Sequence, residues 1–379
     1  MKPRLFSALF GVIIVSSACG GAAPASPSPS AAASVAASKP PAASASASAA
    51  AKPASSGSAA ASAKPAGAAS APAKPAASAG ANLIKIGLNS GTAPTGWPYN
   101  VALTKGFFSQ EGITTQGTPL SSDATQIQAL VAGDVNFTIS GFTVFTAVAG
   151  GAKVKYIASA QTIPNFQLIT AKDVKTWSDL KGKTLAAGVT GSYFEVVMRG
   201  MLKANGLQPN DYQVISMPSS NTRFAALKSG QVAGTLLSIP DENVAIKDGF
   251  PSLGYVGQVI PDLEYNGYVV SDAWATANRD KVLAFLRGLR KATDWLFDPA
   301  NKAEAMDIYG KVSKLPQDDL EAAYGEMIGQ RMLSRDLRPN QKGMDNYIDL
   351  ALSLGAVDKS QVPPKDAWLD LSYVDQIPK

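Results

Sequence analysis

A long low-complexity stretch near the N-terminus limits where this chain can fold. Residues 22–81 consist almost entirely of Ala, Ser, Pro, Gly and Lys. Such a segment has little apolar surface to bury, so it cannot offset the conformational entropy that ordering would cost. We therefore expect residues 20–81 to form a disordered tether, with an r.m.s. span of roughly 45 Å if it behaves as a flexible chain. Any packed fold must come from residues 82–379.

The segment before the tether has the layout of a secretory signal peptide. Lys2 and Arg4 precede an apolar run, residues 5–15, and small residues lead to Cys19. This run is shorter than the about 20 residues that a membrane-spanning helix needs. Residues 1–19 are therefore expected to direct export.

Cys19 is the only cysteine of the chain, so no intramolecular disulfide can form. The sequence of residues 16–20, SSACG, resembles a bacterial lipobox, except that Ser16 stands where the motif usually has Leu. We expect lipid on Cys19 to hold the protein at the cell membrane, in the periplasm or on the outer face. The alternative is a free thiol that is discarded with a cleaved signal peptide.

The basic character of the chain belongs to this N-terminal part. The net charge is +5, but six of the 34 basic residues and none of the 29 acidic ones lie within residues 1–81. The rest of the chain therefore has 34 − 6 = 28 basic and 29 acidic residues, a net charge of −1. This balance gives no electrostatic reason to expect a nucleic-acid partner.

Residues 82–379 alternate between short apolar runs typical of buried strands and segments with helical periodicity. Strands are predicted at residues 83–88, 113–119, 135–140, 154–160, 166–170, 184–188, 211–216 and 233–237. Helices are predicted between them at residues 101–108, 123–132, 143–149, 193–205 and 223–229, with Asp123 and Gln126 as a capping box for the second. The alternation predicts an α/β fold with mostly parallel sheets in two lobes. From Arg279 onward the pattern is helical, and we expect these helices to cover the first lobe.

Four segments carry a resemblance to a known family. They are KGFFSQEGI at residues 105–113, QALVAGDV at 128–135, DLKGK at 179–183 and AALKSGQV at 225–232. Each is common by itself, but in this order they resemble the periplasmic solute-binding proteins for nitrate, sulfonates, taurine and thiamine precursors. The chain lacks histidine, which argues against any ligand that relatives hold through imidazole.

The resemblance implies a two-lobed type II periplasmic-binding-protein fold with flanking helices and a hinge between the lobes. Lobe 1 would comprise residues 82–165 and 272–379, and lobe 2 residues 166–271. The chain would cross between lobes near residues 161–172 and 267–273. A small polar solute (a sulfonate, nitrate, taurine or a pyrimidine-like compound) would bind between the lobes and pass to the permease of an ABC importer. We expect a monomer without cofactor or metal.

Loops at the carboxyl ends of parallel strands are the expected ligand-binding positions in such sheets. This rule selects residues rich in hydroxyls and glycine: Ser90, Thr92, Trp97, Ser121, Ser140, Gly141, Thr143, Thr162, Thr190, Gly191, Ser192, Tyr193, Ser238 and Asp241. Thr190-Gly191-Ser192 is the sharpest candidate, because the start of the following helix offers free N–H donors to an anionic group.

Each candidate also has a structural interpretation. Ser192 is equally typical of a helix cap, and Trp97 and Tyr193 are typical of core packing. Asp241 also fits a solvated loop.

Other functional classes are less well supported. Without histidine, and with its one cysteine at the N-terminus, the chain cannot form an imidazole-dependent triad or a His/Cys zinc site. Phosphate-binding glycine motifs are also missing. A carboxylate-pair enzyme stays open, because such pairs meet only in the fold. A lipoprotein of the same fold that senses a ligand without transporting it stays open as well.

Overall fold

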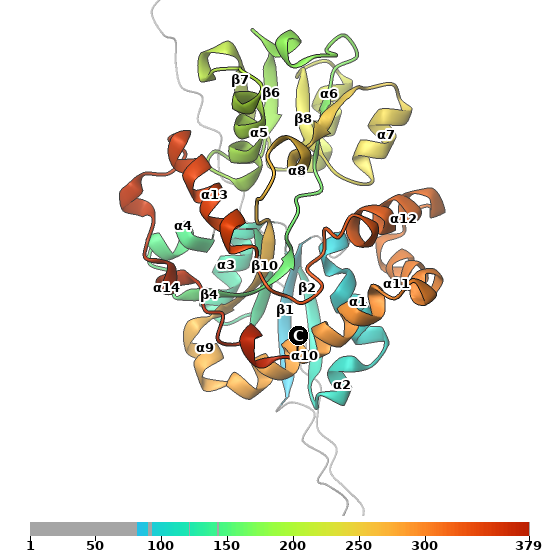
Figure 1. The fold of residues 1–379 in the computed structure, drawn as a ribbon, viewed down its shortest axis with the longest axis vertical. Helices are drawn as coiled ribbons and strands as arrows, with labels where there is room; N and C mark the ends of the chain where they lie inside the picture. The colour runs from blue at the N-terminus through green and yellow to red at the C-terminus, as the bar shows by residue number, and fades with distance from the viewer. Residues whose placement is uncertain (1–81, 90–92, 121, 142–143, 379) are drawn as a thin grey trace, which may run out of the picture. The chain divides into compact units, whose positions relative to one another are not determined.

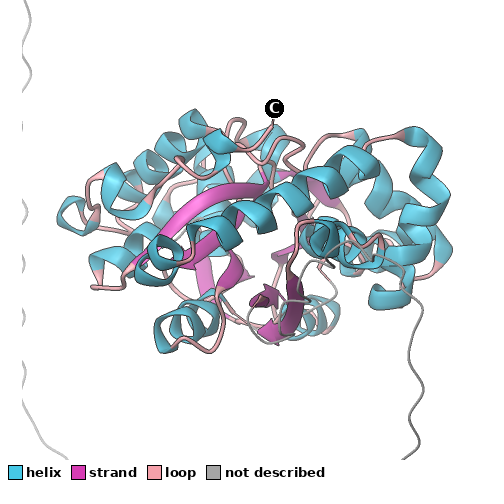
Figure 2. Ribbon diagram, turned by 90° about the horizontal axis from the view of Figure 1, so that it is seen from below, coloured by secondary structure: helices cyan, strands magenta, loops and turns pink. Residues whose placement is uncertain are grey.

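The computed structural model describes residues 82–89, 93–120, 122–141 and 144–378. The predicted signal peptide, the lipidation at Cys19 and the tether lie outside these residues. Figure 1 shows the ribbon of the described part, and in Figure 2 helices lie on both sides of the strands. The predicted fold class is confirmed: two sheets carry flanking helices, although each sheet is mixed rather than purely parallel.

The first sheet has the strand order β2-β1-β3-β10-β4. Its strands are β1 Leu83–Asn89, β2 Thr114–Leu120, β3 Phe137–Gly141, β4 Val154–Gln161 and β10 Asn266–Ser271. β1 runs parallel to β2 and β3, whereas β10 is antiparallel to β3 and β4. Ile84, Ile86 and Leu88 of β1 are buried, as the apolar run at Leu83–Leu88 predicts, whereas the edge strand β2 is largely exposed.

Most helices around the first sheet follow its strands in sequence. They are α1 Trp97–Thr104, α2 Phe107–Gln110, α3 Asp123–Ala132, α4 Val144–Ala149, α9 Asp272–Ala277 and α10 Arg279–Leu296. The predicted capping box of α3 is wrong by one position. Ser122 is the N-cap, and its hydroxyl accepts a hydrogen bond from the backbone N–H of Thr125.

The second sheet has the order β7-β6-β8-β5-β9. Its strands are β5 Gln167–Thr170, β6 Thr184–Ala187, β7 Gln213–Ser216, β8 Gly234–Leu237 and β9 Ser252–Tyr255. β6 is parallel to β7 and β8, and β5 is antiparallel to β8 and β9. The helices of this lobe are α5 Tyr193–Ala204, α6 Ser220–Lys228, α7 Asp241–Lys247 and α8 Val256–Val259.

The C-terminal helices contact both lobes, whereas the sequence predicted a cover for the first lobe alone. α11 Lys302–Ser313, α12 Gln317–Tyr324 and a π-helical segment, Gly325–Gly329, share the apolar core of α1 and α10. α13 Gln341–Ser353 instead packs on α5 of the second lobe, and the short α14 Lys365–Trp368 contacts α4 and β4. α13 thus belongs to a second apolar core, which it shares with α5 and with side chains of β4 and β10.

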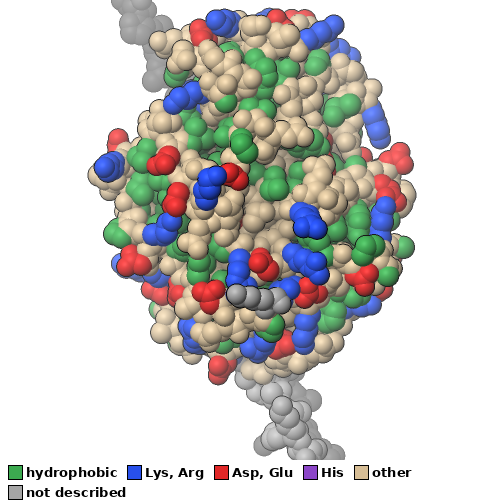
Figure 3. Space-filling model, in the orientation of Figure 1, with side chains coloured by type: hydrophobic (Ala, Val, Ile, Leu, Met, Phe, Trp, Pro, Cys, Tyr) green, Lys and Arg blue, Asp and Glu red, His purple; other side chains and the backbone are tan. Residues whose placement is uncertain are grey.

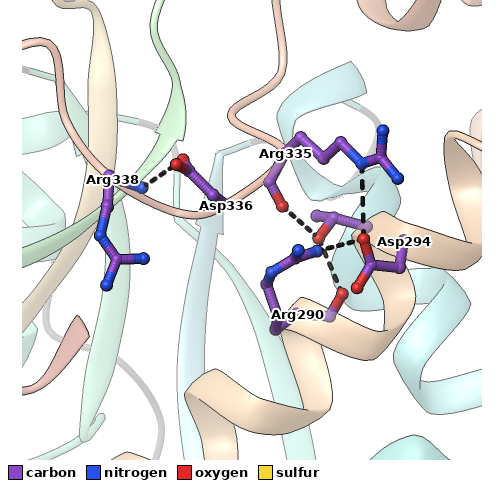
Figure 4. Close-up of polar contacts among 6 residues, drawn as sticks. Arg290, Asp294, Arg335, Asp336 and Arg338 are labelled. Atoms are coloured by element: carbon purple, nitrogen blue, oxygen red, sulfur yellow. Dashed lines mark hydrogen bonds and ion pairs between the residues drawn. The ribbon is translucent and has the colours of Figure 1, made fainter. Parts of the chain in front are cut away.

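An irregular segment links the π-helical segment to α13 and is fixed by polar contacts (Figure 4). The Thr293 hydroxyl donates to the backbone carbonyl of Arg335 at 2.7 Å, and Asp294 accepts from Arg335 at 3.4 Å. The same segment pairs with β4, since the N–H of Ser159 donates to the carbonyl of Leu337 at 2.7 Å. These contacts attach residues 334–340 firmly to the first lobe.

The lobe boundary after β9 differs from the predicted one. The sequence placed the second crossing at residues 267–273, with lobe 2 ending at residue 271. β10, Asn266–Ser271, already belongs to the first sheet, so the chain returns to lobe 1 before Asn266. The first sheet gives way to the second between the end of β4 at Gln161 and the start of β5 at Gln167.

Candidate ligand-binding site

The polar residues of interest lie where the two crossings meet the carboxyl ends of the parallel strands. Within residues 82–378, this edge is formed by the ends of β3 and β4, the start of β10 and the loops that follow β6, β7 and β8. Ligands bind at this edge in open α/β sheets. We refer to it as the interlobe edge.

Four of the predicted ligand residues, Ser90, Thr92, Ser121 and Thr143, lie outside the described residues. Two others are corrected by the structure. Trp97, the first residue of α1, is fully buried against α11, where its indole stacks on Tyr309 at 4.4 Å and its N–H donates to the carbonyl of Ala305 at 3.0 Å. Tyr193 stacks on Tyr347 at 4.8 Å and donates to the carbonyl of Glu264 at 3.0 Å. Both rings belong to the core and are not available to a solute.

The start of α5, predicted as an anion site, already holds a carboxylate of the chain itself. Glu195 accepts the N–H of Gly191 at 2.6 Å and forms an ion pair with Arg199 at 2.8 Å. The Ser192 hydroxyl caps the helix by accepting the N–H of Glu195. Gly191 also lines a cavity of about 350 Å³ together with α4 and residues 356–361, and Thr190 is exposed. Glu195 therefore already takes up the Gly191 N–H and would compete with a solute anion for it.

The remaining candidates lie near the interlobe edge in different environments. Ser140 is buried, and the N–H of Gly141 donates to Asp123 at 3.0 Å. The Thr162 hydroxyl donates to the carbonyl of Met332 at 3.4 Å. Asp241 accepts from the Ser220 hydroxyl at 2.9 Å, and Ser238 is half-buried. The structure brings these residues to the edge without assigning them a ligand.

A group of buried amides lies at the crossings, outside the residues that the strand-end rule selected. Gln161 donates to the carbonyl of Ile163 at 2.7 Å and to Asn165 at 3.2 Å, while its own amide oxygen has no hydrogen-bond partner among the described residues. Asn266 is the direct neighbour of Gln161 in the β10–β4 ladder, and both of its amide atoms lack such a partner. An unpaired buried polar group costs about 1–3 kcal/mol, so a hydrogen-bonding partner for these atoms would be stabilising. Their only sequence signal is a polar residue at each strand end facing a crossing.

A buried guanidinium lies on the second-lobe side of this edge. Arg223 of α6 is 3% exposed, and its Nη1 donates to the carbonyls of Met217 and Pro218, both at 3.0 Å. Its guanidinium lies 5.2 Å from the centre of the Phe194 ring, and its Nε has no partner among the described residues. Burial lowers the pKa of Arg223, an effect that an oxyanion beside it would oppose.

Two buried carboxyl groups meet across the lobes at the same edge. The Tyr255 hydroxyl donates to Glu326 at 2.6 Å and lies 3.3 Å from Glu242. Burial, and then the charge of Glu326, raise the pKa of Glu242 to about 9. Burial also raises the pKa of Glu326. Near neutral pH, this pair therefore retains a proton.

A third buried carboxylate fixes the second crossing. Glu264 accepts hydrogen bonds from the hydroxyls of Tyr156 and Ser159, both at 2.6 Å, and from the N–H of Asn340 at 2.9 Å. Burial raises the pKa of Glu264 to about 7, although all three donors favour the ionised form. Its contacts tie the crossing to β4 and to the start of α13.

The sequence relatives agree with this architecture. The model of the family described as NMT1/THI5 like matches residues 94–303, which is more than half of the chain. The chain belongs to the NMT1/THI5-like family. Within it, the chain is 26% identical over 278 residues to a putative binding protein of Brucella abortus, covering 71% of this chain and 85% of that protein. It is 23% identical over 228 residues to a 4-amino-5-hydroxymethyl-2-methylpyrimidine phosphate synthase of Saccharomyces cerevisiae, covering 56% and 66%.

Solved structures place this NMT1/THI5-like chain in the periplasmic-binding-protein fold. The ligand-binding component of an ABC-type import system from Staphylococcus aureus is similar with a TM-score of 0.64 and 17% identity, covering 78% of this chain and 99% of that one. The alkanesulfonate-binding protein SsuA from Xanthomonas axonopodis, solved with MOPS bound, is similar with a TM-score of 0.62 and 20% identity, covering 76% and 99%. These likenesses establish the fold.

The described residues contain neither a metal-binding cluster nor a membrane-spanning helix. Within them, no group of three or more His, Cys, Asp or Glu side chains is placed to hold a metal ion. No helix in that part of the chain is long and apolar enough to cross a bilayer. Figure 3 shows acidic and basic side chains interspersed over one face of the molecule.

Proposed function

We propose that this protein is an extracytoplasmic solute receptor that binds a small polar molecule at the interlobe edge and delivers it to an ABC importer. The observation that carries the proposal is the set of buried, unpaired amide atoms on Gln161 and Asn266 where the two crossings meet. A solute held between the lobes would supply the missing hydrogen bonds. The fold shared with an ABC-type ligand-binding component supports the same function.

Arg223 supports a solute that carries an oxyanion, such as a sulfonate or nitrate. A buried guanidinium with a free N–H favours a planar or tetrahedral anion, because its fork of donors matches the oxygen geometry. The fold neighbour SsuA, an alkanesulfonate-binding protein, points to the same class. The yeast relative named as a pyrimidine phosphate synthase makes an aminopyrimidine the alternative ligand to test.

A thermal-shift panel tests this proposal directly. Methanesulfonate, taurine, nitrate and 4-amino-5-hydroxymethyl-2-methylpyrimidine are added separately to the purified protein. A ligand that binds only the folded state raises the unfolding free energy by RT ln(1 + [L]/Kd), about 2.7 kcal/mol at a hundredfold excess over Kd. We expect at least one oxyanion to raise the melting temperature. No shift with any of the four compounds would contradict the proposed ligand classes.

Repeating the thermal-shift panel on two variants tests whether Arg223 belongs to the binding site. Arg223→Gln should lose the oxyanion-induced shift, because the buried charge is gone. Arg335→Gln, which removes an exposed guanidinium, is the matched control and should keep the shift. Equal shifts in both variants would remove Arg223 from the site.

Anchoring at the membrane is a separate part of the proposal. We expect the mature protein to begin at a lipid-modified Cys19, so that the tether lets the two-lobed body reach the permease. Mass spectrometry of the N-terminal peptide from membrane fractions checks this, with Cys19→Ser as the control. A mature N-terminus without acyl chains would rule the anchor out.

A further inference from the structure

Polar side chains of the second lobe contact polar side chains of the C-terminal helices. From the second lobe come Glu242 and Asn243 of α7 and Tyr255 of β9. Opposite them are Asp319 of α12 and Glu326 of the π-helical segment. Asn243 donates to Asp319 at 2.9 Å, and Tyr255 donates to Glu326 at 2.6 Å. The contact is therefore built from two polar bridges side by side.

α12 and the π-helical segment pack against the first lobe. Leu320, Tyr324 and Met327 belong to the same apolar core as α1 and α10. α7 and β9, in contrast, pack on the second sheet. Any opening movement of one lobe against the other must therefore separate Glu242 and Tyr255 from Glu326.

Two carboxyl groups in this position need a positive charge or a shared proton. Glu242 is 1% exposed and Glu326 is 5% exposed, so both carboxyl groups are buried. Two buried carboxylates cannot both ionise at short range, because repulsion adds to the cost of desolvation. With one proton between them, the pair is a hydrogen-bonded bridge. Without it, the pair is two buried anions facing each other.

The charged groups of the surrounding elements do not neutralise this pair. On α7, Asp241 accepts from Ser220, while Lys247 is exposed. On α12, Glu321 is paired with Lys302 at 2.6 Å and Asp318 is exposed. Toward the first crossing, the neighbours are the uncharged amides Gln167 and Asn165, which contact Glu242 and Glu326 respectively. Ionisation of the pair is thus left without a compensating cation in the described part of the chain.

We propose that Glu242, Tyr255 and Glu326 form a proton-dependent latch that holds the second lobe against the C-terminal helices and releases it when the pair loses its proton. The state of the latch then biases the equilibrium between closed and open lobes. Because a proton is released on opening, alkaline conditions favour the open form that admits solute, and acidic conditions favour the closed form. This coupling goes beyond solute binding and requires no knowledge of which solute is bound.

The distance between spin labels on the two sides of the latch tests it in the ligand-free full chain. Cys19→Ser removes the only native thiol, and labels are attached to Ile246→Cys on α7 and Val312→Cys on α11, both of which are exposed. Pulsed electron resonance then reports the distance distribution at pH 6.5 and pH 9.5. We expect a single short distance at pH 6.5 and a shift of population to longer distances at pH 9.5.

Variants that replace one carboxyl group by an amide show whether the pH-dependent distance change comes from the latch or from a general effect of pH. Glu242→Gln keeps the shape and hydrogen bonding of the side chain but leaves only one titrating group, so the short distance should persist at both pH values. Glu326→Gln should behave in the same way and serves as a second variant if the first folds poorly. Glu304→Gln, which removes an exposed carboxylate from α11, should retain the wild-type response.

Three results would overturn the latch. They are an unchanged distance in the wild type between the two pH values, a full response in both amide variants, and loss of the response in Glu304→Gln. These distance measurements do not depend on solute binding, so they test the latch independently of the proposed function.

Discussion

The hydroxyl of Tyr156 donates a 2.6 Å hydrogen bond to the carboxylate of Glu264 and thereby joins the middle of β4 to the second crossing between the lobes. Ser159 and the N–H of Asn340 complete the shell of this carboxylate. Tyr193 of the second lobe binds the backbone carbonyl of the same residue. Glu264 thus contacts both lobes and the C-terminal helices at once.

The stability of the protein should depend on pH through Glu264. Its pKa is about 7 when folded, against about 4.3 for an unfolded glutamate. Because the folded value is the higher one, the stabilising contribution is complete below about pH 4 and is lost as pH rises through about 7. We expect the unfolding free energy to fall by up to about 3 kcal/mol over this window, and urea titrations at several pH values would measure it.

Glu264→Gln should reduce this slope without abolishing it, because Glu242 and Glu326 also have raised pKa values and still titrate. It should also lower stability overall, since an amide NH2 replaces one of the two oxygens that accept hydrogen bonds. Glu304→Gln, at an exposed site, should leave the slope as it is. An unchanged slope in Glu264→Gln would show that Glu264 does not contribute to it.

Gly267→Ala should strongly destabilise the fold. A Cβ at Gly267 would collide with the backbone carbonyl of Ala158 and with the hydroxyl of Tyr156, on the β4 side of β10. Backbone cannot move aside as a flexible side chain would, so we expect a loss of about 3 kcal/mol or more in urea unfolding. Gly325→Ala is the matched control, because a Cβ there meets nothing within 4 Å and the residue is helical. A neutral Gly267→Ala would show that β10 and β4 can separate.

Trp97→Phe should reduce stability without changing ligand recognition. The variant loses the 3.0 Å hydrogen bond to Ala305 and part of the stacking on Tyr309, for a cost of about 1–3 kcal/mol. Thermal unfolding measures the loss. The ligand-induced rise in melting temperature should equal that of the wild type. A selective loss of that rise would show that Trp97 contributes to ligand binding.

Glu195→Ala should open the start of α5 to external anions. Removing the carboxylate frees the Gly191 N–H and leaves Arg199 unpaired, so the helix start becomes more positive. We expect a loss of about 1 kcal/mol in buffer and a larger stabilisation by added sulfate than in the wild type. Identical sulfate responses would mean that this helix start binds no anion even when vacant.

Much of the strand and helix pattern could be predicted from the sequence, because a buried strand or helix face requires apolar residues at a characteristic spacing. The apolar runs of β1, β6 and β8 and the helical spacing of α10 were each predicted within a few residues. The shift of the α3 cap from Asp123 to Ser122 is a local error of the same small size. β9 and α7 were missed, because their half-exposed, mixed sequences lack a clear period.

The site residues were much less predictable. Trp97 and Tyr193 follow the rule for strand-end loops, yet their large rings found partners in Tyr309 and Tyr347 across the core. The anion site at Gly191 was filled by Glu195, a residue one helical turn away.

By itself, the sequence determined that residues 82–379 form an α/β chain, because composition and hydrophobic period are local properties. Only the tertiary structure decided which polar groups meet. Gln161 and Asn266 are neighbours through strand pairing, and Glu242 and Glu326 through contact between lobes, although each pair is separated widely along the chain. Such pairings depend on how distant segments pack together, and no short stretch of sequence contains that information.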